Sequence, residues 1–261
     1  MKTFSLILMI LGTFGCSLGA WAAEQPWSYE DTATQVGPQK WGTLPGDELC
    51  GIGKEQTPIN FDSAAAVENP KLPALRFEYK PAQLNLENNG HTIKDKIEAG
   101  SDLIINGTHY ALHQFHFHAS SEHSVDGKFY PMEIHFVHDL GQKPVVIGVF
   151  IQKGKHNAAL DPLLKNFPKK PGEIIMDSKI KFDASNLLPK DLSYFNYKGS
   201  LTTPPCGEGL DWYVLRTPIT MDAGQIRAFT AIDGFAHTHR PIQPLGSRSV
   251  EKLTRPPSQS R

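Results

Sequence analysis

This sequence has few cysteines, no large excess of positive or negative charge, and few long apolar runs. The 26 Lys and Arg residues nearly balance the 27 Asp and Glu residues, and the chain has only three cysteines. Balanced charge excludes the broad basic face that nucleic-acid binding requires, so we expect no nucleic-acid partner. Beyond the N-terminal segment, no stretch is apolar enough to span a membrane.

The N-terminal segment has the order of a secretory signal peptide. Lys2 precedes an apolar run that ends near Leu11, and small residues follow up to Ala22 and Ala23. This order predicts that residues 1–22 are removed by cleavage near Ala22 or Ala23, which makes the mature protein periplasmic or secreted. Lipid attachment through Cys16 is an alternative, although the residues before it match the usual pattern poorly.

Cysteine usage agrees with export. Loss of Cys16 with the signal peptide leaves Cys50 and Cys206, an even number in an oxidising compartment. We expect these two to form a disulfide, and two unrelated buried thiols are the alternative. Closing so long a loop stabilises the fold by roughly 5 kcal/mol at most in the chain-entropy model.

The body of the chain is predicted to be mainly β. Short apolar runs alternate with turn signals, and two short helices are expected near Asp161-Pro162 and after Asp222, where Gln225 completes a capping pattern. No repeat or linker divides the chain. We therefore predict a single mainly β, α+β domain over residues 23–254, as a monomer or a homodimer, with a disordered tail over 255–261. The clearest strand candidates are 84–86, 103–105, 111–118, 133–137 and 145–151.

Histidines are concentrated in one stretch. Four of the 11 histidines lie in "HQFHFHASSEH", residues 113 to 123. In an extended strand, side chains alternate between faces, so Gln114, His116 and His118 share one face while Phe115 and Phe117 share the apolar one. Two imidazoles on the face away from the core suit a metal better than they suit apolar packing.

A third histidine comes from "MEIHFVH", where His135 shares a face with Glu133. If this strand returns beside the first, His116, His118 and His135 converge. Three neutral imidazoles without a thiolate suit zinc, and three protein ligands leave one position for water. Gln114 and Glu133 are in phase with the ligands and predict hydrogen bonds to their outer nitrogens.

Two alternatives stay open from spacing alone. A cupin-like β-barrel would use His116, His118 and Glu122 as ligands, but its last ligand would have to be His156, which leaves His135 unused. A non-catalytic zinc-binding module on the same fold is the other. His113 and His138 fall on the opposite face by parity and are interpreted as structural.

Several motifs occur together in the order typical of one family. They are "NNGH", "QFHFH", "SEH", "EIHFVH", "GSLTTPP" and "RPIQPL". From Trp27 to Leu245 the sequence thereby resembles α-class carbonic anhydrases. The resemblance implies a large central, mostly antiparallel twisted sheet with a few short peripheral helices, and one zinc ion at the base of a conical cleft. It implies reversible hydration of carbon dioxide to bicarbonate by zinc-bound hydroxide. In carbonic anhydrases, as is established for them, zinc brings the pKa of its bound water to about 7.

The same resemblance assigns roles to residues. It implies that His116, His118 and His135 bind zinc and that Gln114 and Glu133 orient them. Thr202 matches the threonine that accepts a hydrogen bond from the hydroxide and donates to a buried glutamate, here Glu122. The remaining matches are a proton-shuttling histidine, His91; two residues that order water, Tyr29 and Asn89; and the substrate pocket of Val137, Val146, Leu201, Thr203 and Trp212.

One departure from the family lies near the expected shuttle. Lys94 occupies a position where many relatives carry a smaller polar residue. A cation there would alter the water of the cleft and the pKa of His91, so the efficiency of proton transfer is the point on which this chain is expected to differ.

Overall fold

The computed structural model describes residues 27–139, 144–232 and 234–254. The predicted signal peptide and the predicted tail lie outside these residues. Among the described residues, no helix has the length and apolar character needed to cross a membrane.

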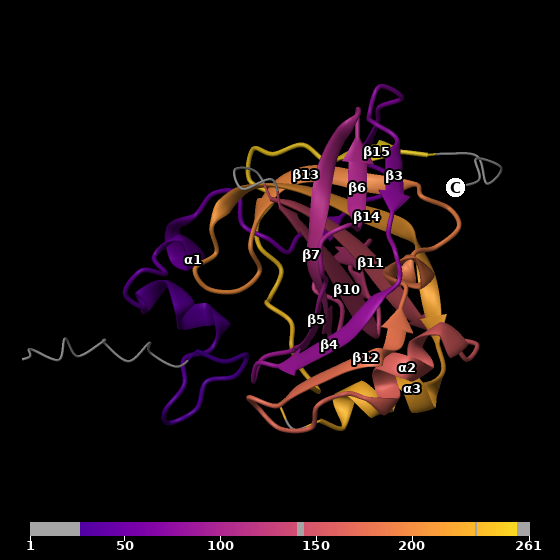
Figure 1. Ribbon diagram of the computed structural model, residues 1–261. Coiled ribbons are helices and arrows are strands. Elements are labelled where there is room, and N and C mark those ends of the chain that lie inside the picture. The colour runs from indigo at the N-terminus through magenta and orange to yellow at the C-terminus, as the bar shows by residue number, and fades with distance from the viewer. Residues whose placement is uncertain (1–26, 140–143, 233, 255–261) are drawn as a thin grey trace, which may run out of the picture.

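One large twisted sheet organises the described chain (Figure 1). Most neighbouring strands are antiparallel, and the two exceptions are the parallel pairs β11–β14 and β15–β2. The expected mainly β, mostly antiparallel architecture is therefore confirmed. In sheet order the strands are β12 (Ile174–Phe182), β4 (Ala82–Asn88), β5 (Ile93–Lys96), β7 (Thr108–His118), β10 (Met132–Asp139), β11 (Val145–Lys153), β14 (Glu208–Met221), β13 (Tyr194–Ser200), β15 (Glu251–Leu253) and β2 (Val67–Glu68), with β6 (Asp102–Ile105) pairing β7 and β3 (Leu75–Glu78) pairing β6.

Smaller elements surround this sheet. A separate three-stranded sheet consists of β1 (Asn60–Phe61), β8 (Ser124–Val125) and β9 (Lys128–Phe129). Three short α-helices are α1 (Leu49–Ile52), α2 (Asp161–Lys165) and α3 (Ala223–Thr230), and the 3-10 turns are η1 (Pro38–Thr43), η2 (Ala158–Leu160) and η3 (Ala184–Leu187). Figure 1 shows α2 and α3 together beside β12, on the far side of the molecule from α1.

The two faces of the sheet carry different clusters. Phe115 and Phe117 of β7 are buried in the larger apolar core, together with Leu163 of α2 and Phe229 of α3. A second apolar cluster includes Val146 and Trp212, and the Trp212 ring contacts His135 of the site described below. The period-two alternation of β7 therefore separates aromatic residues from histidines, as the sequence predicts.

The helix ends follow local chemistry. Asp222 caps α3 by accepting from the backbone N–H groups of Gly224 and Gln225, and Gln225 completes the predicted capping box. Such a cap stabilises a helix by about 1 kcal/mol. The short helix at Asp161 also forms, but Leu160 occupies its N-cap and Asp161 lies in its first turn, where a carboxylate favours the helix dipole.

The predicted disulfide is present. Cys50 in α1 is bonded to Cys206, 156 residues further along the chain, with a Cα–Cα distance of 5.0 Å. Both cysteines are buried beside Trp41. The bond ties the N-terminal helix to the loop that follows β13 and contains Thr202.

Candidate active site

Strand register brings the candidate ligands together. On β7 and β10, His116 is paired with His135, and on the other side of β7 it is paired with Lys94 of β5. Directly paired residues of antiparallel strands project from the same face. Glu133 is paired with His118 and lies on that face as well. The site is therefore built on the central strands of the sheet.

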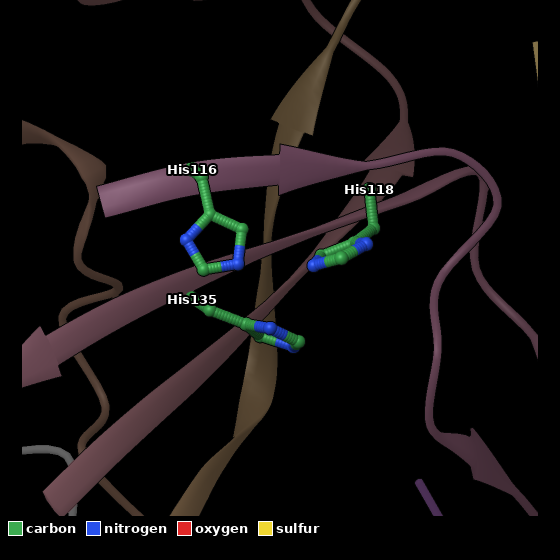
Figure 2. A group of neighbouring side chains, drawn as sticks. All are labelled: His116, His118 and His135. Atoms are coloured by element: carbon green, nitrogen blue, oxygen red, sulfur yellow. The ribbon is translucent and has the colours of Figure 1, made fainter. Parts of the chain in front are cut away.

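The three imidazoles form a compact group (Figure 2). One ring nitrogen from each of His116, His118 and His135 lies within 4.8 Å of the other two. Ring centroids are 5.0 Å apart for His116 and His118, 5.3 Å for His116 and His135, and 4.5 Å for His118 and His135. The three predicted ligands thus converge from two adjacent strands.

The outer nitrogen of each ring is held by an acceptor. His116 Nδ1 lies 2.8 Å from Gln114 Oε1, His118 Nδ1 lies 2.5 Å from the carbonyl oxygen of Thr238, and His135 Nε2 lies 3.0 Å from Glu133 Oε1. Each of these oxygens accepts, so each outer nitrogen carries the proton. The inner nitrogens, Nε2 of His116 and His118 and Nδ1 of His135, then present lone pairs to one another.

Burial keeps these rings neutral. It lowers the pKa of His118 to about 4, and it lowers the pKa values of His116 and His135, with repulsion from the neighbouring rings adding to the effect. Nε2 of His118 is buried without a hydrogen-bond partner among the described residues. An unpaired buried nitrogen is costly, and a bound dication relieves that cost. The donor set fits zinc, which favours neutral imidazoles.

Glu133 is the centre of a buried network. Its Oε1 accepts from His123 Nδ1 at 2.8 Å as well as from His135, and its Oε2 accepts from the backbone N–H of Glu122 and of His123. Burial alone would raise the pKa of Glu133, but its interactions with His123 and His135 outweigh burial and lower it. His123 Nε2 in turn lies 2.7 Å from the hydroxyl of Tyr197.

Glu122 approaches the same group of rings from one side. Its Oε2 lies 3.5 Å from His118 Nε2 and 3.8 Å from His135 Nδ1, while Oε1 accepts from the backbone N–H of Arg240 at 2.9 Å. Burial raises the pKa of Glu122, and His135, Arg240 and the Thr202 hydroxyl as a hydrogen-bond donor oppose that rise. Oε2 itself has no partner of hydrogen-bond geometry among the described residues.

The predicted pocket residues lie on three neighbouring strands and in the loop after β13. Val137, Val146 and Trp212 occupy one register across β10, β11 and β14, next to the pairing of His116 with His135. The Trp212 ring packs edge-on against His135 at 4.8 Å. Leu201 packs on the same apolar cluster from the loop after β13, and Thr203 accepts in that loop from the N–H of Cys206.

The candidate shuttle, His91, lies against the first residues of the described chain. The His91 ring is half-buried and stacks on Trp27 at 3.7 Å, and burial lowers the pKa of His91. Asn89 Oδ1 accepts from the backbone N–H of His91, so it fixes the turn that presents the ring. Tyr29 and His91 line a shared cavity of ≈ 470 Å³. Burial raises the pKa of Tyr29, and the charge of Glu122 raises it further.

Sequence reasoning did not identify four residues that support the site. Thr238 accepts from His118 and Arg240 donates to Glu122 through backbone atoms, which carry no residue-type signal. His123 follows the end of β7, so strand alternation assigns it no face, and the structure shows that it bonds Glu133 and Tyr197. A Cβ at Gly148 would lie 2.9 Å from Glu133 Oε1, so only glycine leaves room for that carboxylate. The paired glycine opposite His135 is the one signal that could have been found.

A mainly β domain with three converging imidazoles defines a candidate metalloenzyme, and comparisons place it more closely. The family model for eukaryotic-type carbonic anhydrase matches residues 36–254. A carbonic anhydrase of Neisseria gonorrhoeae is 40% identical over 246 residues, covering 93% of this chain and 94% of its own. The solved α-carbonic anhydrase of Thermovibrio ammonificans, in complex with sulfanilamide, is 40% identical with a TM-score of 0.82, covering 88% of this chain and all of its own.

A relative with another name is also similar over nearly its full length. Dioscorin DB3L of Dioscorea polystachya is 32% identical over 259 residues, covering 95% of this chain and 93% of its own. The chain belongs to the α-class carbonic anhydrase family. Since relatives of this fold carry more than one name, the case for the activity depends on the residues at the site.

Proposed function

We propose that this chain is an exported zinc carbonic anhydrase that interconverts carbon dioxide and bicarbonate. One observation carries the proposal. Three buried imidazoles converge within 4.8 Å, and the outer nitrogen of each is held by an acceptor that leaves the inner lone pair available. The cupin-like alternative is disfavoured because its required last ligand, His156, is exposed and bonds Asp161 and Asp222 instead.

His116, His118 and His135 would hold one zinc ion per chain. When bound, the ion supplies a Lewis acid that makes hydroxide available near neutral pH. The protein's part is to keep the rings neutral and aimed. Gln114, the Thr238 carbonyl and Glu133 do this by accepting from the outer nitrogens, and such partners typically change metal affinity by 10–100-fold.

Thr202 and Glu122 would orient the attacking oxygen. The backbone N–H of Arg240 donates to Glu122 and favours its ionised form. If Thr202 commits its proton to that carboxylate, its oxygen is left only as an acceptor. The attacking water or hydroxide then donates to Thr202 and directs a lone pair at the substrate.

The substrate would lie against an apolar wall. Carbon dioxide is small, linear and apolar, so it gains from a dry surface more than from hydrogen bonds. We assign Val137, Val146, Leu201 and Trp212 to such a surface beside His135, with the hydroxyl of Thr203 at its edge. Attack on carbon yields bicarbonate and leaves one proton to be removed in each cycle.

His91 would carry that proton to solvent. An imidazole changes its charge near neutral pH, and this ring lies in the cavity that it shares with Tyr29. Asn89 holds the turn beneath it. We assign Tyr29 and Asn89 to the ordering of water between the site and His91, with Tyr29 kept as a neutral donor by its raised pKa.

Export and maturation complete the proposal. The buried disulfide between Cys50 and Cys206 supports folding in an oxidising compartment. We propose that residues 1–22 are removed, that the mature protein is periplasmic or secreted, and that residues 23–254 form the catalytic domain. Monomer and homodimer are both compatible with it.

The test is stopped-flow hydration of carbon dioxide by the purified mature protein, before and after zinc is removed by a chelator. We expect activity to vanish with the metal and to return on stoichiometric zinc. His118→Ala should lose zinc and activity together, whereas His156→Ala should keep both. Full zinc occupancy without turnover would instead establish the non-catalytic zinc-binding module, and activity that survives verified zinc removal would refute the proposal.

A further inference from the structure

A charged pair borders the histidine cluster on the side of β5. Glu87 of β4 is paired with Lys94 of β5, and Lys94 is paired with His116 of β7. Because directly paired residues of antiparallel strands project from one face, all three side chains emerge on the face that carries the candidate ligands. Lys94 is therefore the lateral neighbour of His116, opposite His135.

The charges at this border do not balance. Glu87 Oε2 lies 2.6 Å from Lys96 Nζ but 3.5 Å from Lys94 Nζ, so one carboxylate faces two ammonium groups. The pKa of Glu87 is lowered, and the largest cause is its hydrogen bond with Lys96. The nearer partner of Glu87 is thus the more exposed lysine, with 49% of the Lys96 side chain exposed against 27% for Lys94.

The excess positive charge lies beside the histidine cluster. Lys94 is paired directly with His116, and only 27% of its side chain is exposed. Glu133, a buried carboxylate on the same face, is already engaged by His123 and His135. A half-buried cation beside a ligand acts on a charged species through a lower dielectric than water provides.

We propose that Lys94 makes the β5 side of the site a binding position for small monovalent anions, with bicarbonate as the relevant one. The inference rests on the proposed function for the identity of that anion, but not for the attraction itself. Lys94 strengthens anion binding beside His116, and Glu87 weakens it by partial neutralisation. The same fixed charge opposes the binding of a dication by the histidines.

Anion binding is measured on cobalt(II)-substituted protein, whose visible absorption reports on the metal, by titration with thiocyanate at constant pH and ionic strength. Because Lys94→Gln removes one unit of charge at a neighbouring position, it should lower the affinity for thiocyanate by roughly three- to tenfold. Glu87→Gln should raise that affinity by a similar factor. Lys179→Gln, which removes an exposed charge from the edge strand β12, should change nothing. Bicarbonate is then tested as a competitor, and its affinity should follow the same order.

A second readout needs neither activity nor an anion. Zinc affinity of the metal-free protein, measured by competition with a chelator, should rise in Lys94→Gln and fall in Glu87→Gln, with Lys179→Gln unchanged. Raising the ionic strength should shrink every difference. If the proteins bind metal and hydrate carbon dioxide, yet Lys94→Gln and Glu87→Gln bind thiocyanate as the parent does, this inference is wrong and the proposed function stands. Failure to bind metal at all would instead overturn the proposed function.

Discussion

Asp95 is a carboxylic acid buried on the apolar side of β5, and its replacement by asparagine should stabilise the protein above neutral pH. The side chain is 1% exposed and is paired with Leu86 and Phe115 of the larger core. Its Oδ1 accepts from the backbone N–H of Asn85 at 2.9 Å, while Oδ2 is buried without a hydrogen-bond partner among the described residues. Burial raises the pKa of Asp95 from 3.8 to about 7, against the smaller effect of the Asn85 N–H.

The sign follows from proton linkage. Between pH 3.8 and about 7 the unfolded chain ionises at this position while the folded chain keeps its proton. The contribution of Asp95 to the free energy of unfolding therefore falls by about 1.36 kcal/mol per pH unit over that interval and is constant on either side of it. The full penalty above pH 7 is at most about 4 kcal/mol, and solvent relaxation around the ionised group reduces it.

Asp95→Asn keeps the acceptor for Asn85 and cannot ionise. We expect unfolding free energies close to those of the parent near pH 4, and a gain that grows to between about 1 and 4 kcal/mol at pH 8. The measurement is urea unfolding of the metal-free, disulfide-intact protein from pH 4 to 8. Asp126→Asn is the control. Asp126 is exposed and its pKa is lowered in the folded protein, so the dependence of the free energy of unfolding on pH has the opposite sign for this group. A pH-independent difference between Asp95→Asn and the parent would refute the reasoning.

Four further predictions concern the site and its supports. Thr202→Ala should bind zinc normally but lose most turnover, and normal turnover would exclude the proposed hydrogen-bond relay. His91→Ala should lose rate mainly in dilute buffer and recover it with imidazole, so an unchanged buffer dependence would indicate another proton route. His123→Ala should lower the affinity for zinc by roughly 10–100-fold, because Glu133 loses a partner, and competition with a chelator measures this change. An unaltered affinity would show that the network is dispensable for zinc binding. Replacing Cys50 and Cys206 by serine should lower the free energy of unfolding by roughly 2–5 kcal/mol, and a smaller change in denaturant unfolding would contradict the entropic account.

The ligand cluster is accessible to sequence reasoning because strand geometry is local. The alternation of Gln114, His116 and His118 with phenylalanines is a property of one strand, and the pairing of His116 with His135 requires only that the next strand return beside it. The capping box at Asp222 and Gln225 is local for the same reason. The part of the site on β7 and β10 could therefore be predicted from three local features. These are the chemistry of the side chains, the two-residue alternation along a strand, and the short connection between the two strands.

The remaining contacts depend on distant segments and could not be derived in this way. The carbonyl of Thr238 holds His118 across 120 residues, and the N–H of Arg240 holds Glu122 across 118. Every residue has these backbone groups, so no residue type marks them. The parallel pairing of β11 with β14 is equally invisible, because strands distant in sequence can be paired only once the sheet order is known. The family motifs, rather than the spacing, supplied Thr202 and Glu122.

The two halves of the site rest on different supports. His116, His118 and His135 project from paired central strands, whose positions are fixed by the sheet. Thr202 lies in a loop that is tied down through Cys206, while Arg240 donates from its guanidinium to the carbonyl oxygens of Cys50 and Thr57 and from its backbone to Glu122. We therefore expect a perturbation of the disulfide region to act through Arg240 and Cys206 on Glu122 and Thr202, the groups proposed to orient the attacking oxygen. Of the candidate ligands, His118 is coupled to the same segment through the carbonyl of Thr238, whereas His116 and His135 are held from their own strands by Gln114 and Glu133. Loss of the disulfide is accordingly expected to reduce turnover more than zinc affinity.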